Sequence, residues 1–320
     1  MTSFAPVAYT LGTMAEFERV GVVIPTYNRA DMLREALRSV LDQTVPAAEI
    51  VVVDDGSTDD TPGVVAEFAG AGAPIRLLAG PHTNERSASR NRGVDALESP
   101  LVAFLDSDDI WKPERLERQL GALRQHPEAG FAFCNVHRFN ERGLIGTLPC
   151  LLPSADYNGT ILGDVLLEPL AVSSTLLVRR EALQEVGGFA PMRMNEDYEL
   201  TLRLAARFAA SYVPDVLVLM REHEGRTSRA KRDLPLLDYI SIVERFIEAH
   251  PDMPSTARAR ARQGLANVHL KLARLYTELG EREHARKHLL ASMRLRPLDR
   301  RVYSAYVRLA STHAPAKQGA

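Results

Sequence analysis

Cysteine and long apolar runs are almost missing from this sequence. Its 320 residues include two cysteines, Cys134 and Cys150, which are too few for a disulfide framework and favour a reducing compartment. No apolar run approaches the ~20 residues that cross a bilayer, and residues 1–18 lack the positive segment and apolar core of a secretion signal. We therefore predict a cytoplasmic protein, either free or peripheral on the cytoplasmic face of a membrane.

Charge of one sign is not in excess overall, since 39 Lys and Arg face 41 Asp and Glu, but the charges are unevenly distributed. Residues 251–320 hold 14 basic and 5 acidic side chains, which leaves the first 250 residues acidic. Such a basic tail could contact anionic lipid, an anionic acceptor, a protein partner or the chain's own acidic part, and a homo-oligomer is equally open. Aromatic residues make up 6% of the sequence and no recognition motif is present, so nucleic acid is not an expected partner.

Apolar runs and amphipathic segments alternate through the first 110 residues. Strands are predicted at residues 20–24, 50–53, 75–78 and 101–105, and helices at residues 31–42, 61–69 and 87–97. The predicted strands are apolar almost throughout, which is typical of a parallel sheet covered by helices on both faces. We therefore predict an α/β fold, and ligands of such sheets collect beyond the carboxyl ends of the strands.

The rest of the chain is less regular and then becomes helical. Short strands and turns are predicted over residues 131–148, a strand at 174–179, a helix at 196–209 and a strand at 212–219. Residues 266–299 show the spacing of one tetratricopeptide unit, with an unrelated helical hairpin as the alternative. These patterns predict a poorly ordered leader at 1–18, an α/β domain at 19–229 and a small all-α region at 230–320.

Aspartates follow two of the predicted strands. Asp106, Asp108 and Asp109 come directly after the fourth strand, where hard carboxylate oxygens suit Mg²⁺ or Mn²⁺ bound together with phosphate. One of them could instead cap the helix that follows, although three aspartates exceed what capping requires. Asp54 and Asp55 follow the second strand. There they could contact the base or ribose of a nucleotide, or form an Asp-Gly turn that caps a helix.

Four linked motifs resemble the family-2 glycosyltransferases with the GT-A fold. The motifs are VVIPTYNRADMLREALRSVLDQT, EIVVVDDGSTDDT, SASRNRGVDAL and LVAFLDSDDIWKPERL, and the resemblance covers about residues 19–229. It implies a mostly parallel sheet flanked by helices, with a Rossmann-like nucleotide-binding half. It also implies a nucleotide-sugar donor, commonly a UDP-sugar, a divalent metal (Mn²⁺ or Mg²⁺) and transfer with inversion at the anomeric carbon.

The resemblance also implies roles for individual residues. In the family, the aspartate of a Glu-Asp pair deprotonates the acceptor hydroxyl, which here is Asp197 with Glu196 as the next candidate. An Asn195 cap with acidic residues in the first helical turn is the structural alternative, and both can hold together. Asp55 would hydrogen-bond the base, on which Tyr27 stacks. The residues expected at the donor are Pro25, Thr26, Tyr27, Arg29, Asp54, Asp55, Arg90, Asp106 and Ser107. The residues expected at the metal are Asp106, Asp108 and His223.

One departure from the family's pattern and two other functions stay open. Arg86 stands where relatives usually carry glycine, so its role is undecided. A sugar-phosphate nucleotidyltransferase would carry a Gly-rich basic loop after the first strand, where this chain has residues 25–29 instead. A non-catalytic scaffold in a polysaccharide assembly needs neither base nor metal aspartates, and both are present here. We therefore predict a metal-dependent, inverting glycosyltransferase that acts on a glycan, a lipid-linked or a small-molecule acceptor.

Overall fold

The structure is a computed structural model that describes residues 18–147, 156–223 and 232–311. It divides into two compact units, one of residues 1–165 and 169–224 and the other of residues 166–168 and 225–320. Residues 1–17 of the predicted leader and Cys150 lie outside the described residues. No helix within the described ranges is long and apolar enough to cross a membrane.

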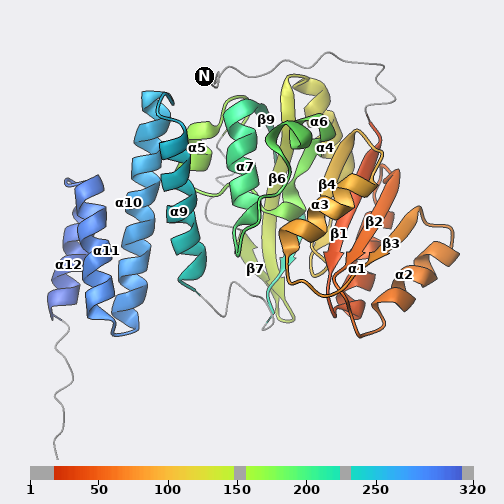
Figure 1. The fold of residues 1–320 in the computed structure, drawn as a ribbon, viewed down its shortest axis with the longest axis horizontal. Helices are drawn as coiled ribbons and strands as arrows, with labels where there is room; N and C mark the ends of the chain where they lie inside the picture. Colours follow the sequence, from red (N-terminus) through yellow and green to blue (C-terminus); the bar gives the residue numbers. More distant parts are fainter. Residues whose placement is uncertain (1–17, 148–155, 224–231, 312–320) are drawn as a thin grey trace, which may run out of the picture. The chain divides into compact units, whose positions relative to one another are not determined.

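A nine-stranded sheet forms the centre of the first unit (Figure 1). Its order is β3-β2-β1-β4-β8-β6-β9-β5, and β7 pairs with β6 outside this path. The strands β1 to β4 are parallel to one another, whereas β8 runs antiparallel to both β4 and β6. The strands are β1 (Val20–Thr26), β2 (Glu49–Asp54), β3 (Ile75–Ala79), β4 (Leu101–Phe104), β5 (Ile110–Trp111), β6 (Ala129–Asn140), β7 (Gly143–Thr147), β8 (Leu177–Arg179) and β9 (Ala209–Arg221).

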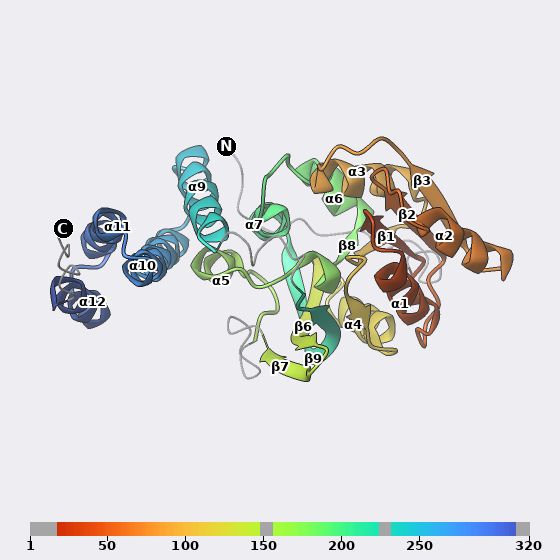
Figure 2. The ribbon, with the colours of Figure 1, turned by 90° about the horizontal axis from the view of Figure 1, so that it is seen from below.

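Helices cover both faces of the sheet, with α1 and α4 on one face and α3 and α6 on the other (Figure 2). The helices of this unit are α1 (Ala30–Leu41), α2 (Thr61–Gly70), α3 (Arg86–Ala96), α4 (Arg115–Gln125), α5 (Leu162–Leu167, whose last two residues belong to the second unit), η1 (Ser173–Thr175, a 3₁₀ turn), α6 (Arg180–Val186) and α7 (Glu196–Arg207). The predicted α/β fold is therefore confirmed, and its first four strands form the expected parallel half.

The parallel half is built from the apolar runs seen in the sequence. Val22, Val23 and Ile24 of β1 are fully buried, as is every residue from 50 to 53 of β2. Helix α3 packs closely on these strands because Gly93 has no side chain, since a Cβ there would lie 2.4 Å from Cγ1 of Val23. The close packing fixes α3, and Arg90 one turn earlier, at the carboxyl ends of the strands.

The second half of the sheet differs from the sequence prediction. The strand predicted at 174–179 is divided into η1 and the three-residue strand β8. The Thr175 hydroxyl donates to the carbonyl of Val172 and accepts from its amide, and such local side-chain bonds favour a turn over a strand. The strand predicted at 212–219 is longer and runs through all of β9.

The second unit is helical. Its helices are α9 (Leu234–Ala249), α10 (Ser255–Glu278), α11 (Arg282–Leu295) and α12 (Arg300–Ser311). Helices α10 and α11 pack as a hairpin in which Ala285 and Leu289 are buried and the Ser292 hydroxyl donates to the carbonyl of Ala266 at 2.9 Å. The hairpin includes residues 266–295 of the segment predicted as a tetratricopeptide unit, and that assignment stays a prediction.

Candidate functional site

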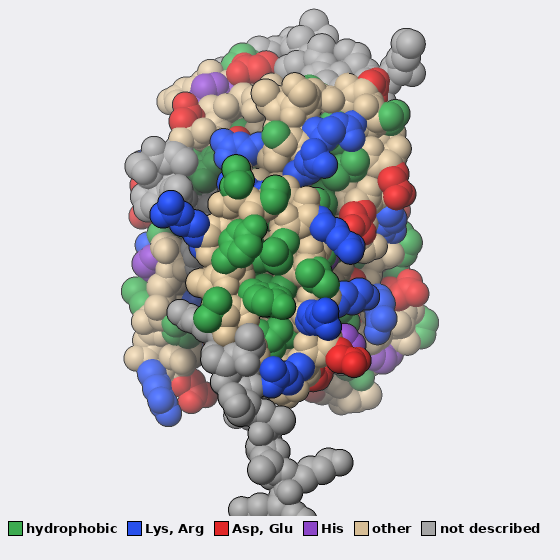
Figure 3. Space-filling view, turned by 90° about the vertical axis from the view of Figure 1, so that its left-hand side faces the viewer, with side chains coloured by type: hydrophobic (Ala, Val, Ile, Leu, Met, Phe, Trp, Pro, Cys, Tyr) green, Lys and Arg blue, Asp and Glu red, His purple; other side chains and the backbone are tan. Residues whose placement is uncertain are grey.

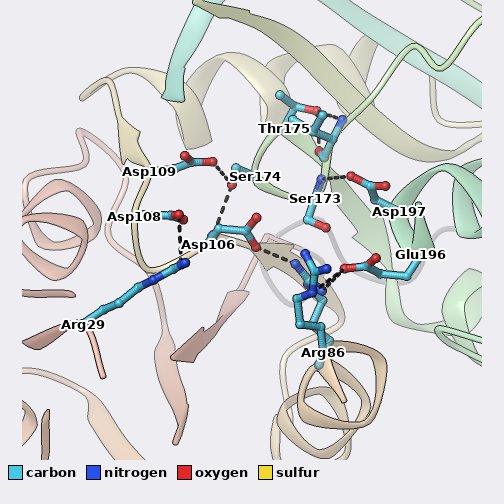
Figure 4. A network of polar contacts seen from close by, with 12 residues as sticks. Arg29, Arg86, Asp106, Asp108, Asp109, Ser173, Ser174, Thr175, Glu196 and Asp197 are labelled. Carbon is cyan, nitrogen blue, oxygen red and sulfur yellow. Dashed lines mark hydrogen bonds and ion pairs between the residues drawn. The ribbon is translucent and has the colours of Figure 1, made fainter. Parts of the chain in front are cut away.

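The carboxyl ends of β1, β2 and β4 meet at one edge of the sheet. In the parallel register, Thr26 of β1 lies opposite Asp54 of β2, and Val23 of β1 lies opposite Phe104, the last residue of β4. The loops after these strands therefore begin side by side. The polar side chains of the loops after β1 and β4 converge with those from η1 and from the start of α7 (Figure 4). The structure thus brings together sequence segments that the motifs predicted to share a site.

Asp108 contacts two other predicted site residues. Its Oδ2 lies 2.9 Å from Nη1 of Arg29 and 2.9 Å from Nε2 of His223. Asp108 is buried, and Ser107 beside it is also buried. Arg29 comes from the loop after β1 and His223 from the segment after β9, so three distant parts of the chain meet at one carboxylate.

The donor set suits a divalent cation that is shared with a diphosphate. Mg²⁺ and Mn²⁺ take one or two protein carboxylates and fill the remaining positions with substrate phosphates and water. Asp108 and His223 supply a carboxylate and an imidazole side by side, with Asp106 two residues away. Within the described residues no three Asp, Glu, His or Cys side chains form a ready metal cluster. The residues therefore fit a metal that completes its coordination with the donor.

The aspartates after β2 are held by the protein itself. Asp54 accepts hydrogen bonds from the amide and hydroxyl of Ser57, so it stabilises the Asp-Gly turn. The Asp55 carboxylate accepts from the amide and hydroxyl of Thr83 and from the amide of Asn84, and it pairs with His82 at 2.9 Å. Burial would raise the pKa of Asp55, but these hydrogen bonds and His82 outweigh burial, so the pKa is lowered.

His82 is a site residue that sequence reasoning missed. Its ring stacks on that of Tyr27, with centroids 3.9 Å apart and an angle of 13° between the planes. The close approach of this segment depends on Gly56, because a Cβ there would lie 2.6 Å from the amide nitrogen of His82. Tyr27 is 40% exposed, so the face of its ring away from His82 is the surface on which a base could stack. A lone histidine in a loop carries no sequence signal of this role.

Arg90 is a buried cation that links the two sides of the site. Its Nη2 lies 2.6 Å from Oδ1 of Asp106 and its Nη1 lies 2.9 Å from Oε1 of Glu196. The guanidinium also lies over the ring of Phe189, 5.4 Å from its centroid. Burial lowers the pKa of Arg90, but the carboxylates of Asp106 and Glu196 raise it by more, so this side chain stays charged. Glu196, predicted as the second base candidate, is the buried partner of this arginine.

Asp197 lies beside Glu196 in the first turn of α7. Burial raises the pKa of Asp197 to about 6, with a further contribution from the neighbouring Glu196, while Arg90 opposes the shift. Its Oδ1 accepts from its neighbour's amide at residue 198, and its Oδ2 accepts from the amide of Ser173 at 3.3 Å. Asn195 is the N-cap residue of α7, with a left-handed φ of 58°, and acidic residues fill the first turn as the capping alternative predicted, but the Asn195 side chain makes no capping hydrogen bond.

The turn η1 connects the aspartates after β4 with Asp197 at the start of α7. Sequence reasoning also missed this role of η1. The Ser174 hydroxyl donates to Asp109 at 2.6 Å and accepts from the amide of Asp106 at 3.1 Å, while the preceding amide of Ser173 reaches Asp197 (Figure 4). The carbonyls of residues 174 to 176 accept from the side chains of Trp111, Gln119 and Arg115. Asp109 therefore braces η1 and does not cap the next helix, whose N-cap residue is Glu114.

Arg86 lies at the edge of this site. Its Nε is 3.8 Å from Oε1 of Glu196 and its Nη2 is 3.5 Å from the carbonyl of Arg193. The side chain is 46% exposed, so part of the guanidinium faces solvent beside the Glu196–Asp197 pair. The position that departs from the family's usual glycine therefore adds a positive charge on the side of Asp197.

Comparison with known proteins gives consistent matches. The family model described as glycosyl transferase family 2 matches residues 21–187. The Escherichia coli protein WfgD, a UDP-Glc:alpha-D-GlcNAc-diphosphoundecaprenol beta-1,3-glucosyltransferase, is 32% identical over 127 residues, which are 40% of this chain and 49% of WfgD. The chain spans 20% to 65% of the length of the first three curated relatives that it matches.

Solved structures share the fold. TarS 1-349 from S. aureus is 20% identical with a TM-score of 0.65, covering 90% of this chain and 83% of that one, and it has also been solved with UDP-GlcNAc. The mannosyltransferase PcManGT from Pyrobaculum calidifontis, in complex with GDP-Man and Mn²⁺, is 20% identical with a TM-score of 0.61, covering 93% of this chain and 76% of that one. At these identities the likeness establishes the predicted GT-A fold alone.

Proposed function

Because the chain belongs to glycosyl transferase family 2, we propose that it transfers a sugar from a nucleotide-sugar to a hydroxyl group of an acceptor. A UDP-sugar is the proposed donor, in line with the UDP-sugar in the name of WfgD and the UDP-GlcNAc bound to TarS. The proposed acceptor is a glycan, a growing polysaccharide or a glycolipid. The proposed reaction depends on a divalent metal and inverts the anomeric carbon.

One observation carries the proposal: Arg90 joins Asp106 of the strand-end turn to Glu196, the neighbour of Asp197, with both ion pairs shorter than 3 Å. The segment with Asp197, the candidate base, and the turn with Asp106 and Asp108, the candidate metal ligands, are thereby held on opposite sides of the buried Arg90 guanidinium. An inverting transfer needs this separation, because the attacking oxygen and the leaving diphosphate occupy opposite sides of the anomeric carbon.

The proposed reaction is a single displacement. Asp197 takes the proton of the acceptor hydroxyl as the acceptor oxygen bonds to the anomeric carbon, and the bond from that carbon to the diphosphate oxygen breaks with its electron pair. A bound Mg²⁺ or Mn²⁺, held by Asp108 and His223, would neutralise charge on the diphosphate. Arg29 lies at the same carboxylate and can donate to a diphosphate oxygen. With a pKa of about 6, Asp197 is mostly ionised near pH 7 and still basic enough to accept a proton.

The proposed function predicts that a nucleotide-sugar raises the melting temperature of the full chain in a metal-dependent way. A ligand at 100-fold excess over its Kd stabilises the folded state by about 2.7 kcal/mol, which corresponds to a shift of several degrees. A thermal-shift panel of nucleoside diphosphates and nucleotide-sugars, with and without Mn²⁺ or Mg²⁺, measures this. Asp108→Ala should abolish the metal-dependent part. Asp215→Ala, which removes an exposed carboxylate paired with Arg118 elsewhere in the unit, should leave it unchanged.

No shift with any nucleotide would contradict the donor site and favour a non-catalytic scaffold. A sugar-phosphate nucleotidyltransferase is distinguished in the same panel, because it would respond to a nucleoside triphosphate with a sugar phosphate. The loop after β1, residues 27 to 29, is Tyr-Asn-Arg and lacks the glycines that such an enzyme uses around its triphosphate.

The two hydrogen bonds of the Ser174 hydroxyl predict that Ser174→Ala lowers the turnover number. Removing the hydroxyl leaves the buried Asp109 without one donor and the amide of Asp106 without its acceptor, so both carboxylate groups lose part of their alignment. We expect kcat to fall by about 10–10²-fold, because a small displacement of the catalytic carboxylates lowers the rate of the chemical step. The donor KM should change less. Ser174→Thr retains a hydroxyl and should recover part of the rate. Ser304→Ala, on α12, is the matched control, and an equal loss there would contradict the brace.

A further inference from the structure

Helix α12 carries apolar side chains on two faces. Val302 and Leu309 are 1% and 6% exposed and pack inward within the helical unit. Tyr303, Tyr306 and Val307 are 47%, 45% and 66% exposed, and their spacing of three and four residues places them along one outer stripe. A helix that is apolar on opposite faces is normally covered on both, so the outer stripe is a surface for a partner.

Two further exposed leucines lie on α11 and on the turn before α12. Leu298, in the turn between α11 and α12, is 93% exposed, more than any other large hydrophobic residue that the structure describes. Leu290 of α11 is 38% exposed. We call Leu290, Leu298, Tyr303, Tyr306 and Val307 the α12 patch. Figure 3 shows hydrophobic side chains gathered on this end of the helical unit, with Lys and Arg side chains around them.

The surroundings of the α12 patch are basic. Residues 281–311 contain eight Arg and Lys against three Asp and Glu, and one of these acids, Asp299, is paired with Arg301 at 2.6 Å. The exposed basic side chains nearest in sequence to the patch are Arg286, Lys287, Arg294, Arg300 and Arg301. An apolar centre with a positive rim complements a surface that offers acyl chains beneath negative headgroups.

The same charges argue against a second copy as the occupant. Two copies related by a two-fold axis would bring this basic rim against itself, and like charges across an interface cost free energy. A lipid surface has no such penalty. Tyrosine rings suit the headgroup level of a bilayer, while exposed leucine and valine suit the acyl region just below it.

We propose that the α12 patch docks the protein on the surface of an anionic lipid bilayer, with Leu298 and the outer stripe of α12 entering the interface and the surrounding arginines binding headgroup phosphates. The helical unit lies on the bilayer and does not span it. This inference does not depend on the proposed sugar transfer, because it rests on the helical unit alone.

The test is flotation of the full chain with vesicles of phosphatidylcholine alone or of phosphatidylcholine mixed with phosphatidylglycerol. We expect partitioning at least about 10²-fold stronger onto the anionic vesicles, weakened by added salt. Leu298→Ser/Tyr306→Ser and Arg294→Glu/Arg300→Glu should each lower the partition coefficient at least about 10-fold. All four side chains are exposed, so the melting temperature should stay that of the parent chain.

Matched controls come from the same helical unit. Leu279, at the end of α10, is 58% exposed and Arg262 of α10 is also exposed, so Leu279→Ser and Arg262→Glu remove the same kinds of side chain outside the patch and should bind as the parent does. Absence of binding to anionic vesicles would overturn the proposal, as would equal binding by parent and patch variants. An oligomer in vesicle-free solution that Leu298→Ser/Tyr306→Ser dissociates would also overturn it, because a second copy would then cover the patch.

Discussion

Asp197→Asn is expected to lower kcat for sugar transfer by about 10²–10⁴-fold, the range that a positioned general base contributes. Asparagine keeps the size of the side chain and can still accept the hydrogen bond from the amide of Ser173, but it cannot take a proton from the acceptor. Donor affinity should change little, since the candidate donor contacts lie on the opposite side of Arg90. Steady-state rates with a donor found in the thermal-shift panel, and the donor Kd measured separately, check both statements.

The pH dependence gives an independent reading of the same residue. With the pKa of Asp197 raised to about 6, the rate of the parent chain should fall as pH decreases through 6, because protonation removes the base. A carboxyl whose pKa is higher in the folded than in the unfolded state also destabilises the fold once it is ionised. The free energy of unfolding of the parent chain should therefore decrease as pH rises through 6. In Asp197→Asn, both this change in stability and the fall in rate on the acidic side of the pH profile (the acidic limb) should be absent.

Glu199→Gln is the control for Asp197→Asn, because it removes a carboxylate from the same turn of α7 that is paired with Arg203 and not with the site. We expect it to retain the rate and the acidic limb of the parent. If Asp197→Asn kept more than about a tenth of the parent kcat, the role of base would have to pass to another group.

Arg90→Met is expected to destabilise the first unit by about 3–5 kcal/mol, as found when one partner of a buried ion pair is removed. Arg90 is 2% exposed and Glu196 is 4% exposed, so the substitution leaves a buried carboxylate with only the longer ion pair to Arg86, at 3.8 Å. The free energy of unfolding from urea titrations of the full chain measures the effect. Transfer activity should be lost as well, because Asp106 and Glu196 would no longer be held relative to each other.

A double variant separates charge from packing in this prediction. Arg90→Met/Glu196→Gln removes the buried carboxylate charge along with the arginine, and we expect it to regain part of the lost stability without regaining activity. Arg90→Lys keeps one charge but cannot bridge two carboxylates in the same way, so it should fall between parent and Arg90→Met. A loss of less than about 1 kcal/mol in Arg90→Met would mean that the pair contributes no more than an exposed ion pair.

The parallel half of the fold could be predicted because its signals are local. The apolar run from Val20 to Ile24 indicates a buried strand without reference to distant residues, and the helix at 31–42 shows its buried face by its own spacing. The Asp106 and Asp108 positions follow from the same logic, because carboxyl ends of parallel strands must share an edge. Site residues that directly follow a parallel strand can therefore be predicted from the sequence.

The brace around η1 could not be predicted because its bonds join distant segments. Trp111 and Arg115 bind carbonyls more than sixty residues further along, and nothing near either residue indicates those partners. The short strand β8 gives a weak local signal, so residues 174–179 looked like one continuous strand. Ser174 and His82 illustrate the limit: both are ordinary residue types, and their roles come from what three-dimensional packing places beside them.

The position of β8 has a consequence for how the chain folds. β2 pairs with β1 and β3, its neighbours in sequence, so these loops close at modest entropic cost, whereas β1 also pairs with β4 over a long separation, with Val20 opposite Leu101. β8 instead inserts between β4 and β6, where Leu101 meets Arg179, and only then can η1 bring Asp106 and Asp197 into register. Long-range pairings of this kind form slowly. During synthesis β1 to β4 therefore emerge before β8, and a chain that has emerged only as far as β4 already carries Arg90 before Glu196 exists to neutralise it.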